Sequence, residues 1–292
     1  MKNIVLILCC LITVTVNAQD SIAAHYKIYD TRTHSIITID KIVADMTDAD
    51  VLFFGEEHND SACHYLENRI FRALHNQFGS KIALSMEMFE TDNQLVLNEY
   101  LAGQIDESRM AKDARLWSNY KDYRAMVDYA KQNMLTVIAA NPPRRYVSMV
   151  SKRGMSSLDS LSKEAKKLLP PLPYDTLSGR YREKFNEVMQ GSPGADNPNI
   201  YYSQNLWDAG MSYSIWSFLK KNKDHKVFHC VGRFHCEEKL GTAAQLAMRN
   251  KKLKILAISS FSDKSFANPD WSQFANLGDY VIITDPDLKK TF

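Results

Sequence analysis

The sequence has 292 residues, of which 45% are hydrophobic and 24% are charged. These values are those of an ordinary globular protein and exclude a collagen-like, low-complexity or wholly disordered chain. The 36 Lys and Arg residues nearly balance the 34 Asp and Glu residues, giving a formal net charge of +2 at pH 7. Because a nucleic-acid binder needs a concentrated basic face, this balance argues against nucleic acid as the partner.

The first 18 residues have the pattern of a secretory signal peptide. Lys2 supplies a positive charge, residues 4–16 form an apolar stretch, and small residues precede a cleavage position after Ala18. The stretch is shorter than the roughly 20 residues that a transmembrane helix needs. Its two cysteines follow bulky side chains, which argues against a lipid-anchored N-terminus. We therefore predict a soluble mature chain, residues 19–292, exported to the periplasm or cell envelope.

Six short apolar runs predict strands that are buried on both faces, because their side chains do not alternate between apolar and polar. They are residues 51–54, 81–88, 135–140, 227–231, 253–259 and 280–284. Between the first three runs, apolar residues recur every three or four positions, within 63–74 and 123–130, which indicates amphipathic helices. The alternation of strand and helix predicts an α/β fold with a mostly parallel sheet flanked by helices. Residues 26–29 and 35–39 predict a small hairpin or edge strand before this core.

A long interval separates the predicted strand that ends at residue 140 from the one that begins at residue 227. It contains helical patterns at 163–169, 180–190 and 201–220. Because a single crossover connection does not need so many elements, we predict a helical insertion at about 150–222 that caps one α/β domain, rather than a second independent domain.

Polar motifs follow the predicted strands. Residues 55–58 (Gly-Glu-Glu-His) follow the first strand, Glu87 lies near the end of the second, and residues 232–235 (Gly-Arg-Phe-His) follow the fourth. The carboxyl ends of parallel strands share one edge of a sheet, where ligands bind. The sequence therefore predicts that four side chains gather at this edge: Glu56, His58, Glu87 and His235.

Histidine and glutamate together suit either a transition-metal site or acid–base chemistry on a water molecule. Each motif alone also fits a structural role, since a Gly-rich turn and a buried histidine are common without function. A purely structural explanation is weaker for two Gly-x-x-His units that both follow buried strands. The sequence has no Gly-rich phosphate loop, no Gly-x-Ser-x-Gly elbow and no His-Glu-x-x-His helix.

Three cysteines remain after cleavage of the signal peptide: Cys63, Cys230 and Cys236. An odd number excludes a fully paired disulfide framework, and one bridge is the most that a single chain could form. Cys230 and Cys236 flank the second histidine motif but lack the Cys-x-x-Cys spacing of a structural zinc site. We interpret both as packing residues.

Six sequence blocks resemble the ChaN-like proteins of the haem-binding uptake, Tiki superfamily, and they come in the order of that family. They are Leu52 to Asp60 with His64 shortly after, Ser85 to Glu90, Trp117 to Tyr123, Ile138 to Arg144, Gln204 to Met211, and Val231 to His235. The resemblance implies an α/β core with a helical cap, export to the cell envelope, and haem binding connected with iron uptake. The wider superfamily includes Tiki-type metal-dependent proteases and erythromycin esterase-like hydrolases, whose active sites use paired Gly-x-x-His units and glutamates.

The resemblance favours an exported haem-binding protein. A haem site needs an axial ligand and cationic groups for the propionates. We expect Tyr146 as the iron ligand, and Arg144, Arg145 or Arg233 beside a propionate. The partners implied are haem, an envelope haem-uptake system and a second copy of the chain on haem binding.

Two other functions stay open. In a metal-dependent hydrolase, the catalytic residues would be Glu56, His58, Glu87 and His235. A divalent metal ion held by His58, Glu87 and His235 would activate the attacking water. Alternatively, the chain is a non-catalytic binding module that keeps these residues at the sheet edge.

Overall fold

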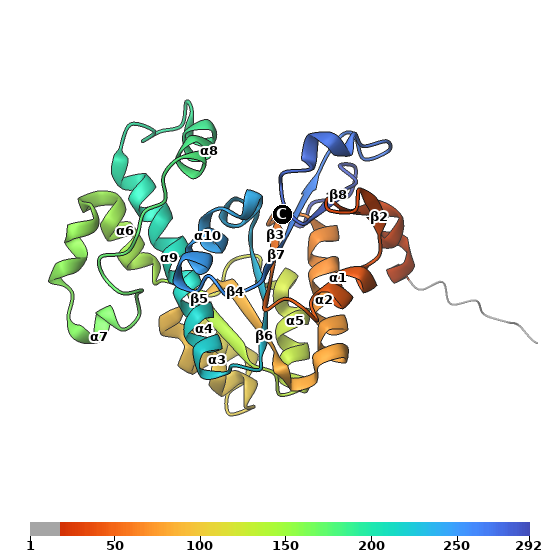
Figure 1. Cartoon of the computed structure of the whole chain (residues 1–292). Coiled ribbons are helices and arrows are strands. Elements are labelled where there is room, and N and C mark those ends of the chain that lie inside the picture. The colour runs from red at the N-terminus through yellow and green to blue at the C-terminus, as the bar shows by residue number, and fades with distance from the viewer. Residues whose placement is uncertain (1–17) are drawn as a thin grey trace, which may run out of the picture.

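The computed structural model describes residues 18–292, so the predicted signal peptide lies outside the described residues except for Ala18. An eight-stranded sheet forms the centre, in the order β2-β1-β8-β7-β3-β6-β4-β5 (Figure 1). The strands are β1 Tyr26–Asp30, β2 Ser35–Ile37, β3 Val51–Glu56, β4 Ile82–Glu90, β5 Val137–Asn141, β6 Lys226–Gly232, β7 Ile255–Ser262 and β8 Tyr280–Thr284. Strand β1 pairs antiparallel with β2 and β8, and the other neighbours pair parallel. The predicted α/β fold with a mostly parallel sheet is confirmed.

Ten α-helices accompany the sheet in the described chain. They are α1 Ile39–Asp45, α2 Ser61–Phe78, α3 Gln94–Leu101, α4 Glu107–Asp113, α5 Tyr120–Gln132, α6 Arg144–Arg153, α7 Lys163–Lys166, α8 Arg180–Met189, α9 Pro198–Lys221 and α10 Gly241–Arg249. None of these is long and apolar enough to cross a membrane.

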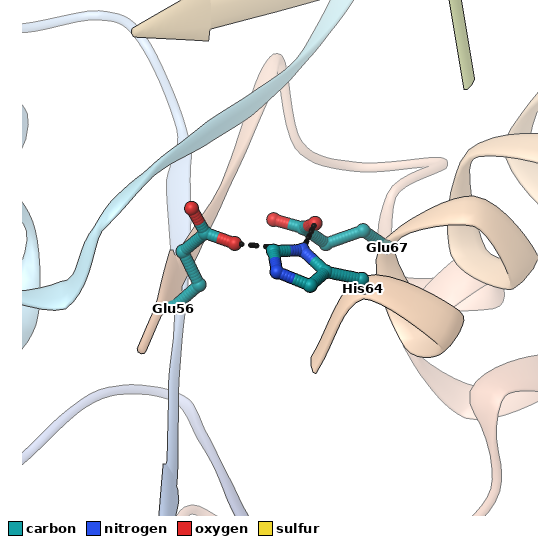
Figure 2. Close-up of side chains that lie close together, drawn as sticks. All are labelled: Glu56, His64 and Glu67. Atoms are coloured by element: carbon teal, nitrogen blue, oxygen red, sulfur yellow. Dashed lines mark hydrogen bonds and ion pairs between the residues drawn. The ribbon is translucent and has the colours of Figure 1, made fainter. Parts of the chain in front are cut away.

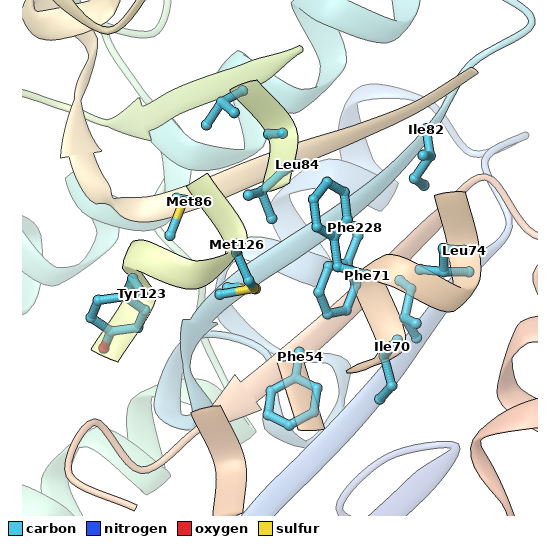
Figure 3. Close-up of a cluster of buried hydrophobic side chains, with 14 of the residues drawn as sticks. Phe54, Ile70, Phe71, Leu74, Ile82, Leu84, Met86, Tyr123, Met126 and Phe228 are labelled. Atoms are coloured by element: carbon cyan, nitrogen blue, oxygen red, sulfur yellow. The ribbon is translucent and has the colours of Figure 1, made fainter. Parts of the chain in front are cut away.

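Alternate side chains of each central strand enter two separate hydrophobic clusters, one on each face of the sheet. On β3, Leu52 and Phe54 point into the cluster that α2 and α5 cover. In that cluster Phe71 of α2 stacks on Phe228 of β6 with ring centroids 6.2 Å apart (Figure 3). Val51 and Phe53 point to the other face, which α9 and α10 cover. The central strands are therefore buried on both sides, as their continuous apolar runs predict.

Helix α2 begins directly after the first histidine motif. The Asp60 side chain accepts hydrogen bonds from the backbone N–H groups of Ala62 and Cys63 and so caps the helix. The cap fixes the turn between β3 and α2. Helix α2 therefore begins at the edge of the sheet formed by the carboxyl ends of the parallel strands, where the predicted site lies.

The interval between β5 and β6 contains helices α6 to α9. Helices α6, α7 and α8 lie to one side of the sheet (Figure 1). Helix α9 packs in two different hydrophobic clusters along its length. In its first half, Leu206 and Ala209 pack in a hydrophobic cluster, called here the cap cluster, with Val147, Val150, Leu158, Leu169 and Tyr174. Further along, Met211 and Ile215 pack on the sheet. The same helix thus packs with the helices between β5 and β6 and covers one face of the core.

The cysteines of the described chain, Cys63, Cys230 and Cys236, are free and buried. The Cys63 thiol lies 3.0 Å from the Ser260 hydroxyl. Burial raises the pKa of each thiol, so these cysteines are neutral packing groups at pH 7.

Candidate functional site

Strands β3, β6 and β4 are neighbours, and their carboxyl ends bring the predicted polar residues to one edge of the sheet. Glu56 is the last residue of β3, and His58 follows two residues later. Glu87 lies in the last part of β4, and His235 ends the short 3₁₀ helix Arg233–His235 that follows β6.

The His58 imidazole is fixed by a carboxylate. Its Nδ1 lies 2.6 Å from Oε1 of Glu56, and because a carboxylate only accepts, Nδ1 donates. The Tyr123 hydroxyl donates to the same oxygen, also over 2.6 Å. Burial lowers the pKa of His58, but the hydrogen bond to Glu56 and the charges of Glu87 and Glu56 outweigh it and raise the pKa to about 9. The side chain is 37% exposed, so His58 is a cationic group that solvent can reach.

His235 is held in the same way by a residue of helix α9. Its Nδ1 lies 2.7 Å from Oδ1 of Asp208 on α9. Asp208 in turn accepts hydrogen bonds from the Thr242 hydroxyl, at 2.9 Å, and from the Tyr181 hydroxyl. Burial lowers the pKa of His235, but the charges of Asp208 and Glu87 outweigh it, and the pKa is raised. Helix α9 therefore sets both the orientation and the charge of a histidine at the sheet edge.

Glu87 lies between the two imidazoles. Its Oε2 accepts a hydrogen bond from the backbone N–H of Gly232 over 2.7 Å. Its Oε1 is 3.9 Å from Nε2 of His235. The charge of Glu87 also contributes to the raised pKa of His58. The structure thus brings His58, Glu87 and His235 together, and their catalytic and metal-binding roles stay predictions.

The two Gly-x-x-His units pack against each other through their glycines. A Cβ at Gly55 would lie 2.6 Å from Sγ of Cys236 and 2.9 Å from Cα of Arg233. A Cβ at Gly232 would lie 2.8 Å from Nε2 of His58. Each glycine therefore leaves room for the other unit, which explains why both units begin with glycine.

Both histidines use Nδ1 to bind a carboxylate, so Nε2 is the nitrogen that remains for chemistry. An imidazole oriented in this way can transfer a proton or bind a metal ion. Aromatic rings stand beside both: Trp117 lies edge-on to His58 with centroids 5.2 Å apart, and Trp207 lies edge-on to His235 at 6.3 Å. The site therefore combines charged side chains with aromatic side chains that pack beside them.

A second cluster lies directly behind Glu56. His64 and Glu67, both on α2, meet Glu56 in the buried interior (Figure 2). Nδ1 of His64 is 3.2 Å from Oε2 of Glu56 and 3.2 Å from Oε2 of Glu67. Burial opposes ionisation of both carboxyls. The hydrogen bond to His58 and the nearby His64 nevertheless hold the pKa of Glu56 low, whereas burial and the charge of Glu56 raise the pKa of Glu67.

The predicted haem ligands lie on α6, outside this hydrogen-bonded cluster. Tyr146 is half-buried and packs against the cap cluster, with the Arg145 guanidinium 4.5 Å from its ring centroid. Arg145 forms an ion pair with Asp92. Arg144 is exposed. Arg233, by contrast, is 2.7 Å from a carboxylate oxygen of Glu237, and its guanidinium lies over the ring of Phe261.

Several polar residues of the site were not assigned a role from the sequence: Tyr123, His64, Glu67 and Asp208. One signal points to Glu67, because it lies on the apolar stripe of its helix, four residues after Cys63 and three before Ile70. Asp208 has a similar signal, since it interrupts a largely apolar and aromatic helix between Trp207 and Ala209. A buried carboxylate needs a partner, but the sequence does not say which one.

The model of the family described as haem-binding uptake, Tiki superfamily, ChaN, matches residues 42–246. The chain belongs to this ChaN-like family. A solved structure of ChaN of Campylobacter jejuni, described by its cofacial haem binding, has a similar fold, with a TM-score of 0.68 and 17% identity over 89% of this chain and 97% of that one. Weaker likenesses are an erythromycin esterase (TM-score 0.48, 10% identity, 89% and 83% covered) and a Bacillus cereus protein (0.44, 14%, 84% and 74%). No curated protein matches the sequence.

Proposed function

We propose that this protein binds haem, is exported to the cell envelope and serves haem or iron uptake there. The observation that carries the proposal is the match to the haem-binding ChaN family over residues 42–246. The signal-peptide pattern supports export. A protein that takes up haem from outside the cell would encounter its ligand in the cell envelope. An envelope uptake system is then the partner, and haem is the ligand that the two exchange.

Tyr146 is the proposed axial ligand. Its ring packs against the cap cluster, as Trp207 does, and Trp207 also faces His235. An apolar and aromatic environment of this kind suits a porphyrin, and a phenolate oxygen is one of the axial ligands that proteins supply to haem iron. When bound, the ferric haem would supply the redox-active iron; the chain would hold and orient it.

Arg144 is the proposed partner of a haem propionate. Of the three candidate arginines, Arg145 and Arg233 already pair with Asp92 and Glu237. Arg144 begins α6, two residues before Tyr146, and its exposed side chain is the one that can turn toward a carboxylate without losing an ion pair within the described chain.

A hemin titration of the purified mature chain, followed by absorption spectroscopy, tests the proposal. We expect saturable binding with a ferric, high-spin spectrum, and gel filtration at saturation shows whether two copies associate. Arg144→Gln should weaken hemin binding, whereas Arg153→Gln, an exposed arginine at the other end of the same helix, should not. The absence of a defined hemin spectrum for the wild-type protein would overturn the proposal.

The hydrolase alternative is not favoured by the family match. We therefore assign no turnover to His58, Glu87 and His235. In the proposed function these residues form the polar border of the ligand site next to the cap.

A further inference from the structure

We propose that Glu56, His64 and Glu67 form a binding site for one divalent transition-metal ion, separate from the haem site and from the His58–Glu87–His235 cluster. Each residue offers one ligand atom, and these atoms lie within 4.8 Å of one another. Figure 2 shows the carboxylates of Glu56 and Glu67 next to the His64 ring, with a dashed line from each, and both of these contacts end at Nδ1. A single ion placed among the three atoms would contact one nitrogen and two oxygens.

Two carboxylate oxygens of this cluster point to a missing ligand. Oε2 of Glu56 and Oε1 of Glu67 are buried, and neither accepts a hydrogen bond from residues 18–292. Both side chains have 0% exposure, so water does not solvate them from outside. Near Oε2 of Glu56 lies Nδ1 of His64, at 3.2 Å. Because buried carboxylate oxygens are normally hydrogen bonded or ligated, two such oxygens in one cluster with a histidine nitrogen indicate room for a cation.

The orientation of His64 supports metal binding independently. Its Nε2 lies 3.1 Å from the backbone oxygen of His58. A carbonyl oxygen only accepts, so Nε2 carries a hydrogen in every state of the ring. Nδ1 faces carboxylate oxygens of Glu56 and Glu67 at 3.2 Å, so it carries a second hydrogen in the metal-free protein, and a bound ion would replace that hydrogen. Metal-ligating histidines are held in this way, with the distal N–H on a carbonyl or carboxylate.

The outer side of the cluster is also held in place. The Tyr123 hydroxyl and Nδ1 of His58 both donate to Oε1 of Glu56, each over 2.6 Å. These two hydrogen bonds leave Oε2 of Glu56 for the interior. A carboxylate that is anchored through one oxygen and free at the other is well prepared to bind an ion.

The donor set indicates the class of ion. One imidazole nitrogen and two carboxylate oxygens suit Zn²⁺, Mn²⁺ or Fe²⁺, whereas Cu⁺ prefers sulfur, and Ca²⁺ takes six or more oxygens. The two carboxylates would also neutralise a doubly charged ion. The competing occupant is a proton on Nδ1 of His64, which would make the cluster a buried ion pair that needs no metal.

A metal-binding experiment distinguishes a metal ion from a proton at this site. It uses the mature chain, stripped of metal with a chelator and kept free of haem. Isothermal titration with Zn²⁺ and Mn²⁺ should give one site in the wild-type protein, and the bound ion should raise the unfolding temperature. Glu67→Gln should weaken that affinity at least tenfold. Glu87→Gln is the matched control, because it changes a buried carboxylate of the neighbouring cluster, and it should keep the site.

The stability of the metal-free variant keeps the test decisive. Glutamine preserves the shape of Glu67 and replaces a carboxyl whose ionisation is opposed by burial and by Glu56, so metal-free Glu67→Gln should unfold at the same temperature as the metal-free wild-type protein, or at a higher one. Added Zn²⁺ should no longer stabilise it. Absence of a site in the wild-type protein, or loss of the site in Glu87→Gln but not in Glu67→Gln, would overturn the proposal. Because every readout uses haem-free protein, failure here is distinct from failure of haem binding.

Discussion

Gly232 leaves the space that the His58 imidazole occupies, since a Cβ at position 232 would lie 2.8 Å from Nε2 of His58. The backbone N–H of the same glycine donates to Glu87. One residue without a side chain therefore positions two members of the cluster. The Gly-x-x-His pattern here is as much a packing requirement as a chemical one.

Alanine at the two motif glycines should have different effects. Gly232→Ala meets the end of a partly exposed side chain that can turn aside, so we expect its loss of unfolding free energy to come mainly from the lost hydrogen bond between His58 and Glu56. In Gly55→Ala the new methyl group would clash with Cα of Arg233 and the carbonyl oxygen of Ile258. Both are backbone atoms that cannot turn aside as a side chain can, so the free energy of unfolding should fall by about 1–3 kcal/mol. Denaturant unfolding measures both values.

The same Gly232→Ala variant should move His58 away from Glu56. Burial lowers the pKa of His58, and the hydrogen bond to Glu56 is the largest of the contributions that together raise it to about 9, so the pKa should fall when this bond is lost. Titration of the imidazole C–H signals by NMR reports this change. An unchanged His58 pKa in a folded Gly232→Ala protein would contradict the packing described here.

Asp208→Asn should lower the pKa of His235. The charge of Asp208 works against burial, so its removal leaves burial opposed chiefly by Glu87. The amide can still pair with Nδ1, so the fold should survive. NMR titration measures the shift, with Asp159→Asn, an exposed position of the cap, as the control that should leave His235 unaffected.

His229 should make the protein sensitive to mild acid. Burial lowers its pKa to about 3, despite the hydrogen bond to Ser85. The unfolded chain takes up a proton on His229 near pH 6.5, and the folded chain does not. The free energy of unfolding is therefore unaffected by His229 above about pH 6.5 and decreases as the pH falls from there toward 3. The loss should reach a few kcal/mol.

A His229→Asn variant tests this assignment, because the amide can replace the hydrogen bond of Nδ1 but does not titrate. We expect lower stability at pH 8, from lost packing, together with a shallower decline in unfolding free energy between pH 7 and 5. Other titrating groups are shared by both proteins, so the difference in slope reports His229. Equal slopes would show that another group causes the acid sensitivity.

The strands of the core could be predicted from the sequence because burial on both faces leaves a local mark, a run of apolar residues such as 51–54. The neighbourhood of His58, Glu87 and His235 followed from the rule that parallel strands share one edge. Helix α7 is shorter than the predicted helix at 163–169 and ends at Lys166, and residues 170–173 contain three prolines, which do not extend a helix.

The partners of the site residues could not be predicted in the same way. Asp208 reaches His235 from a helix 27 residues earlier, and Glu67 meets Glu56 only because α2 packs on the sheet. Such contacts depend on tertiary packing. A single sequence can indicate that a carboxylate is buried, but it does not indicate which residue that carboxylate contacts.

Tyr146→Phe tests the central claim, that the chain binds haem through a phenolate, most directly. It removes one hydroxyl, and Tyr202→Phe is the matched control, since Tyr202 is also partly buried and packs against the same cap cluster. We predict that the wild-type protein and Tyr202→Phe give the same ferric, high-spin hemin spectrum, because a phenolate is a weak-field ligand, and that Tyr146→Phe loses or shifts it at an unchanged unfolding temperature. If Tyr146→Phe binds hemin with the wild-type spectrum while His58→Ala does not, the tyrosine assignment is wrong and a histidine holds the iron.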